Sequence, residues 1–86
     1  MKEIRTSCGV TVTVDEGIFD DMEMLDRLTD FQAGRYEAMP QLIRDVLGDQ
    51  KQAVYDALRD ERGRVPTKAF GQVFGEILAE ALPKNG

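Results

Sequence analysis

Histidine is absent from this sequence of 86 residues, and cysteine and serine occur once each, as Cys8 and Ser7. A nucleophilic thiol or hydroxyl needs a neighbouring base to activate it, and without histidine the usual pairs cannot form. The same absence excludes zinc sites and most transition-metal sites, which take histidine and cysteine ligands. We therefore predict a protein that is not an enzyme and that binds no cofactor or metal ion.

The sequence also lacks the features of secreted and membrane proteins. A single cysteine cannot form an internal disulfide, which suits the reducing cytoplasm. No apolar run approaches the roughly 18 residues of a membrane-spanning helix, and the sequence opens on charged, alternating residues rather than on a signal peptide. We expect a soluble protein of the cytoplasm that has no membrane partner.

Acidic residues outnumber basic ones, 16 to 11, and give a net charge of −5 at pH 7. Binding to phosphate backbones needs a basic stripe, so we expect no nucleic-acid partner. The acidic residues gather at Asp15, Glu16, Asp20, Asp21, Glu23, Asp26 and Asp30. They form either a solvated helix face with several helix caps or a docking site for a basic partner. A smaller basic cluster, which would complement them inside an oligomer, lies at Arg59, Arg62, Arg64 and Lys68.

The start of the sequence alternates between apolar and polar side chains, which is the period of a β-strand with one buried face. Ile4, Val12 and Val14 lie on the apolar face, and Gly9 can adopt the positive φ of a tight turn. We predict a hairpin over about residues 2–14. Because an isolated hairpin is marginal in water, its valine face must pack on helices.

Apolar residues at helical spacing predict four helices, near residues 19–32, 38–47, 50–60 and 66–82. Gly48 is a typical residue after a helix end, and Asp49 follows as an N-cap for the next helix, with Gln52 placed as in a capping box. Pro66 suits the start of the last helix, where its missing N–H costs nothing. The predicted fold class is α+β, a single domain over residues 1–86 in which one layer of helices covers an N-terminal hairpin.

The last helix carries the strongest amphipathic stripe, which includes Phe70, Phe74 and Leu78. Such a stripe packs into the chain's own core or contacts a partner. Gly71 and Gly75 lie beside it, and glycine inside a helix costs about 1 kcal/mol relative to alanine. A close neighbour would account for both glycines, either another helix of the same chain or a subunit or partner.

Two further features suit protein contacts. Methionine adapts to surfaces that must repack, so Met22, Met24 and Met39 indicate either an adaptable groove or flexible core filling. A corner of arginines and acids between the last two helices offers charge matching. The candidate protein-binding residues are Phe70, Gly71, Phe74, Gly75 and Leu78 on the last helix and Arg59, Arg62 and Arg64 at the corner.

The order of the elements and two short motifs resemble a known family. The motifs are the helix end Val46-Leu47-Gly48 and the corner over residues 58–66, Leu-Arg-Asp-Glu-Arg-Gly-Arg-Val-Pro. The pattern covers nearly the whole chain, and it resembles the small tail assembly chaperones that long-tailed bacteriophages and prophages encode just before the tape measure protein.

This resemblance implies a non-catalytic assembly factor that acts in the host cytoplasm and is absent from the mature virion. Its partners would be the tape measure protein, which it keeps soluble, and the tail tube protein, whose subunits it helps to recruit. Self-association is also expected, because a core of this size is only modestly stable. Two rival interpretations stay open: a small phage or prophage DNA-binding regulator, whose recognition helix would be residues 66–82, and a structural tail or head–tail component.

Overall fold

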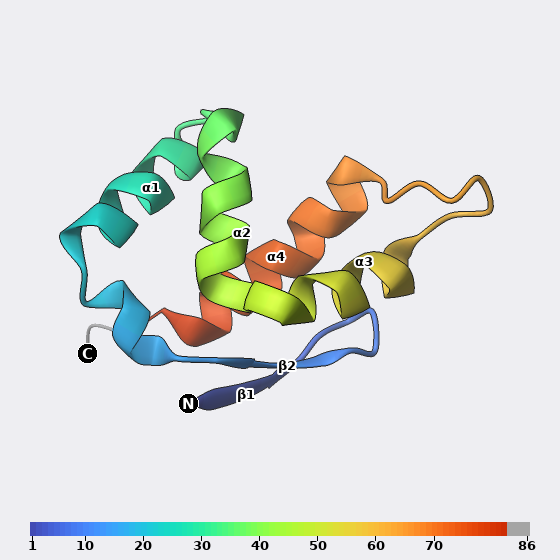
Figure 1. Ribbon diagram of the computed structural model, residues 1–86, viewed down its shortest axis with the longest axis horizontal. Helices are drawn as coiled ribbons and strands as arrows, with labels where there is room; N and C mark the ends of the chain where they lie inside the picture. Colours follow the sequence, from blue (N-terminus) through green and yellow to red (C-terminus); the bar gives the residue numbers. More distant parts are fainter. Residues whose placement is uncertain (83–86) are drawn as a thin grey trace.

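The computed structural model describes residues 1–82, and in this part of the chain a two-stranded hairpin precedes the helices (Figure 1). The elements in chain order are β1 (Lys2–Arg5), β2 (Thr11–Val14), the 3-10 helix η1 (Glu16–Phe19), α1 (Met22–Gln32), the 3-10 helix η2 (Tyr36–Ala38), α2 (Met39–Leu47), the 3-10 turn η3 (Gly48–Gln50), α3 (Lys51–Leu58) and α4 (Thr67–Ala81). The predicted fold class, a mostly helical α+β protein with an N-terminal hairpin, is confirmed.

The hairpin forms as the alternating pattern predicts. β1 and β2 are antiparallel, with Ile4 opposite Val12 and Lys2 opposite Val14. Ile4, Val12 and Val14 are buried, while the residues between them on each strand are exposed. Gly9 turns the chain with a φ of 90°, a conformation that favours glycine. The hairpin therefore has one apolar face, and this face packs on the helices.

The first helix begins later than the sequence predicts. In place of one helix over residues 19–32, the short η1 precedes α1. Two aspartates cap these elements in series. The side chain of Asp15 accepts a hydrogen bond from the backbone N–H of Gly17 at 3.0 Å, and that of Asp21 accepts one from Glu23 at 2.9 Å. Each cap satisfies an N–H that a helix start leaves unpaired, so the acidic segment is divided between two elements.

α2 and α3 follow one another without a loop, which corrects the predicted division into four separate helices. α2 ends at Leu47, and Gly48 after it has a φ of 52°, the positive value expected of a glycine after a helix end. Asp49, the predicted N-cap, lies within η3 instead, and α3 begins after Gln50 without a side-chain cap. The stretch from α2 to α3 is one bent segment, and together with α1 and α4 it makes three long helical segments.

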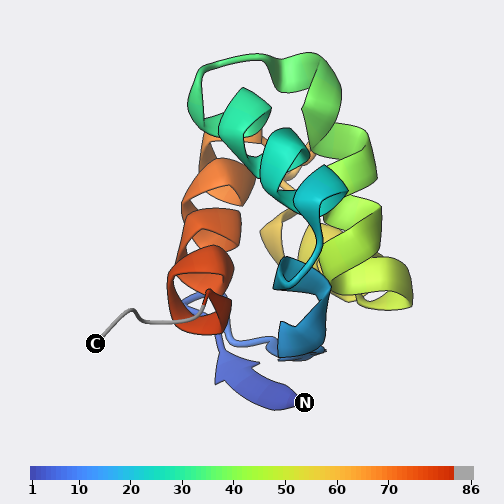
Figure 2. The ribbon, with the colours of Figure 1, turned by 90° about the vertical axis from the view of Figure 1, so that its left-hand side faces the viewer.

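One hydrophobic core joins the hairpin to all three helical segments. Figure 2 shows α1 in front, with α4 on one side, α2 on the other and the hairpin beneath. At the centre, the ring of Phe74 stacks on Phe70 with centroids 5.6 Å apart and meets the ring of Phe31 edge to face at 6.0 Å. An ion pair of 2.8 Å between Arg27 and Asp45 ties α1 to α2. The core and this ion pair thus connect the three helical segments.

Candidate functional site: an apolar groove with a basic rim

The apolar stripe of α4 faces the chain's own core. Phe70 is 4% exposed, Phe74 is completely buried and Leu78 is 6% exposed. Phe74 and Leu78 therefore offer a partner almost no surface, which favours the core interpretation of these two residues. Phe70 is equally buried, but it also lines a surface hollow.

The two glycines of α4 have no close neighbour among the described residues. A Cβ atom added at Gly71 or at Gly75 would meet no atom within 4 Å, apart from the helix's own backbone. Close packing of another helix in this part of the chain therefore does not explain them. Gly75 is exposed, whereas Gly71 is half-buried and lines a surface hollow.

Nearby acidic side chains, Asp56 and Asp60, stabilise the predicted corner between α3 and α4. The guanidinium of Arg59 pairs with the carboxylate of Asp56 at 2.9 Å, and together with Gln52 it lowers the pKa of that carboxyl. The carboxylate of Asp60 accepts hydrogen bonds from the backbone N–H groups of Arg62 and Arg64, at 2.9 and 3.0 Å. Both of these arginine side chains are exposed. The corner projects beyond the two helices that it joins (Figure 1).

A groove runs between α2, α3 and the start of α4. Three adjoining hollows of about 250, 300 and 610 Å³ compose it, and Met39 lines all three. We call it the apolar groove, after the side chains that line it: Phe31, Tyr36, Met39, Ile43, Tyr55 and Phe70. Gly71 belongs to the floor of the largest hollow, where the missing side chain leaves space.

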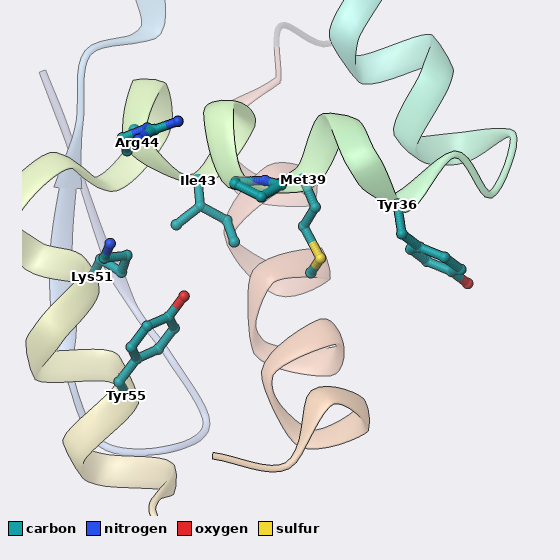
Figure 3. Close-up of a pocket in the computed structure, with 7 residues that line it drawn as sticks. Tyr36, Met39, Ile43, Arg44, Lys51 and Tyr55 are labelled. Carbon is teal, nitrogen blue, oxygen red and sulfur yellow. The ribbon is translucent and has the colours of Figure 1, made fainter. Parts of the chain in front are cut away.

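The two walls of the groove differ: Tyr55 is held in place on one side, and Met39 on the other can adapt. Figure 3 shows Tyr55 of α3 pointing toward Ile43 and Met39 of α2, with Tyr36 at the far end. The ring of Tyr55 packs edge to face on Phe70, with centroids 5.2 Å apart, which holds the tyrosine in place. Met39 opposite is flexible and half-buried, so this wall can adjust to different side chains.

Basic side chains line two of the three hollows of the apolar groove, and we call Arg44, Lys51 and Lys68 the basic rim. Arg44 and Lys51 lie at the end shown on the left of Figure 3, where the ammonium of Lys51 is 5.7 Å from the centre of the Tyr55 ring. None of the described residues that line the three hollows is acidic. In a chain with a net charge of −5, the charged side chains that line the groove are therefore all basic.

Comparison with protein-family models, curated proteins and solved structures finds no significant match to this chain. Within residues 1–82, no cluster of acidic or cysteine side chains is arranged to hold a metal ion. The helices of this region also lack the combination of length and apolar composition that crossing a bilayer needs. The apolar groove is the feature from which we argue function.

The sequence indicated only part of this groove. Of the three methionines that suggested an adaptable surface, Met39 lines the groove, Met24 is buried in the core at 2% exposure, and Met22 is 72% exposed. Tyr36 and Tyr55 were not among the predicted site residues. They are the only two tyrosines of the chain, and an aromatic ring with a polar edge is the side chain most typical of binding surfaces.

Proposed function

We propose that this protein is a non-catalytic tail assembly chaperone, which binds amphipathic helices of the tape measure protein in the apolar groove. In this proposal it keeps the tape measure protein soluble in the host cytoplasm, helps to recruit tail tube subunits, and is absent from the mature virion. The observation that carries it is a groove with apolar walls, a basic rim and no acidic lining residue among residues 1–82.

The groove matches the needs of one class of ligand, an amphipathic helix with acidic residues beside its apolar face. Such a helix places apolar side chains at i, i+3, i+4 and i+7 into a groove of this kind. Each leucine or phenylalanine that it buries gains about 1.5–3 kcal/mol. Carboxylates at the edge of the same helix would meet Lys51 and Lys68, which fixes its orientation more than it adds affinity.

A chaperone for a long helical protein must accept many similar segments rather than one sequence. Met39, which lines all three hollows, supports this role because its unbranched side chain can repack around different partners. Tyr36 and Tyr55 provide large apolar area with few rotatable bonds, as the residues that dominate binding energy usually do. The proposed groove thus combines broad tolerance with fixed aromatic contacts.

Co-expression with a long helical tape measure protein tests the proposal. We expect the long protein to stay soluble and to elute as a complex with the wild-type chain. Tyr36→Asp should abolish both effects, because it places a charge at the groove. Met22→Asp is the matched control, since Met22 is as exposed as Tyr36, at 72% against 69%, and lies outside the groove.

Four outcomes would count against the proposal. If the long protein stays insoluble with the wild-type chain, chaperone activity is excluded. If Tyr36→Asp and Met22→Asp behave alike, the groove is the wrong surface. Salt-sensitive retention on DNA would favour the regulator, and recovery of the chain in purified particles would favour a structural component.

A further inference from the structure

The two outer edges of the hairpin differ in how their backbone groups are satisfied. On β2, the side-chain amide of Gln50 covers the edge: its oxygen accepts from the N–H of Thr13 at 2.6 Å and its nitrogen donates to the carbonyl of Thr13 at 2.7 Å. The backbone of Thr13 therefore points away from β1. Pairing of another chain with β2 at Thr13 would therefore have to displace Gln50.

The register of the hairpin shows which backbone groups of β1 point outward. Thr13 is opposite Glu3, and Thr11 is opposite Arg5. In an antiparallel ladder, hydrogen-bonded and non-hydrogen-bonded pairs alternate. Since the backbone of Thr13 points away from β1, Glu3 and Arg5 both belong to non-hydrogen-bonded pairs, and their N–H and C=O groups face the outer edge.

This outer edge of β1 is open in the described part of the chain. The N–H and C=O groups of Glu3 and Arg5 have no hydrogen-bond partner within residues 1–82. Figures 1 and 2 both show β1 at the lower margin of the molecule. Contacts on either side hold the strand in place, with Lys2 donating to the carbonyl of Glu80 at 2.7 Å and the N–H of Ser7 donating to Glu76 at 2.8 Å. The open edge is therefore preformed.

We propose that β1 pairs with β1 of a second copy of this chain, antiparallel and centred on Ile4, to form one four-stranded sheet across the dimer. In this arrangement Glu3 of each copy lies opposite Arg5 of the other. Each of these pairs would exchange two backbone hydrogen bonds. The exposed side chains of the same residues would form ion pairs on the solvent face of the sheet.

The charge pattern of β1 selects this partner and this register. A shift that centred the pairing on Glu3 would place Glu3 against Glu3, and a shift that centred it on Arg5 would place Arg5 against Arg5. Charges on an edge strand usually prevent pairing, because like charges meet. Here the alternation of an acidic and a basic residue around Ile4 makes the strand complementary to itself only when Ile4 is central.

A symmetric contact of this kind is closed, so it produces a dimer and no larger assembly. The pairing uses a strand that contributes no residue to the apolar groove. It therefore does not rest on the proposed chaperone function, and a dimer would carry two grooves. Burial of the open edge would also add stability to a small domain.

Charge exchange between residues 3 and 5 tests the pairing with matched variants. Glu3→Arg places two arginines opposite one another across the interface, and Arg5→Glu places two glutamates there, so each variant alone should weaken the dimer. Two like-charge pairs in place of two opposite ones should raise the dissociation constant at least about tenfold. Neither residue takes part in an ion pair within residues 1–82, and their cross-strand neighbours are threonines, so the fold should tolerate both changes.

The pairing also predicts two rescues. The double variant E3R/R5E restores opposite charges and should dimerise as the wild-type chain does. A mixture of the two single variants should form a heterodimer, because one chain then carries two arginines and the other two glutamates. Light scattering on a sizing column, from micromolar to millimolar chain, should give twice the 9.6 kDa chain mass for the wild type, the double variant and the mixture. Circular dichroism verifies that each variant is folded.

Several results would overturn the proposal. A wild-type mass of 9.6 kDa at every concentration excludes the dimer. A mass that grows without limit indicates an open contact elsewhere on the chain. Equal dissociation constants in the wild type and both single variants would show that β1 is not part of the interface. Failure of the double variant and of the mixture to dimerise would exclude the Glu3–Arg5 register.

Discussion

The carboxylate of Glu76, on α4, accepts hydrogen bonds from both the backbone N–H and the hydroxyl of Ser7 in the hairpin turn, at 2.8 and 2.5 Å. This pair joins residues that are 69 positions apart in the sequence, and it fixes the turn end of the hairpin to the last helix. The hydroxyl and the N–H of Ser7 both hold the pKa of Glu76 below its usual value of 4.5. The contact therefore makes folding sensitive to pH.

Acid should weaken this contact. Because the pKa of Glu76 is lower in the folded chain than in the unfolded chain, the contact stabilises the fold fully above the usual pKa, and this stabilisation is lost as pH falls through the folded-state pKa. We expect Glu76→Gln to flatten the dependence of the free energy of unfolding on pH as pH falls through and below the usual glutamate pKa of 4.5. Urea unfolding of both chains at several pH values measures this dependence. Equal pH slopes for wild type and variant would contradict the assignment.

Gly75→Ala should stabilise the isolated chain. A Cβ atom at this exposed position of α4 meets no atom within 4 Å, and alanine is favoured over glycine in a helix by about 1 kcal/mol. The control is Gly48→Ala, which should destabilise the chain because the φ of 52° and ψ of −128° at Gly48 disfavour any side chain. Urea unfolding compares the two. A loss of stability in Gly75→Ala would reveal a close neighbour that the described residues do not provide.

Phe74→Ala should destabilise the fold far more than a change at a binding surface would. Phe74 is completely buried and contacts the rings of Phe31 and Phe70, so its removal leaves a cavity in the centre of the core. The expected loss is about 3–5 kcal/mol in the free energy of unfolding. For a small domain this is enough to lower the melting temperature strongly or to prevent folding. A variant with near wild-type stability would show that Phe74 is not a core residue.

The basic rim should contribute to partner binding in a salt-dependent way. Lys68→Glu reverses a charge beside the largest hollow, and we expect it to weaken binding of a tape measure segment by about 1 kcal/mol, or roughly fivefold. Arg62→Glu makes the same charge change at the corner, outside the hollows, and serves as the comparison. Titration calorimetry at low and high salt compares the affinities of the two variants for the segment. A larger loss of affinity in Arg62→Glu than in Lys68→Glu would show that the partner binds at the corner instead.

The sequence predicts best those features in which one residue's chemistry fixes the local structure. The alternation of Val12 and Val14 with threonines predicts the hairpin and its buried face, and Gly48 marks the end of α2. The position of Asp49 was misleading, because several polar residues near a helix junction can serve as caps. In the structure no side chain caps α3, because the chain continues into it from α2 through η3, where Asp49 lies.

Most of the groove could not be predicted from the sequence, because the residues that line it are far apart along the chain. Met39 precedes Tyr55 and Phe70 by many residues, and only the packing of α2, α3 and α4 brings the three side chains together. The apolar stripe of α4 was visible in the sequence. Periodicity alone, however, does not show which of its residues are covered by the same chain, as Phe74 is, and which reach a surface hollow, as Phe70 does.

Binding of a purified helical segment of a tape measure protein to the apolar groove is the most direct test of the proposed function. Titration calorimetry should give a measurable dissociation constant for the wild-type chain, an unchanged one for Met22→Asp, and no detectable binding for Tyr36→Asp, with all three chains folded by circular dichroism. Equal binding by the three chains, or no binding by the wild-type chain to any segment of the tape measure protein, would contradict the account.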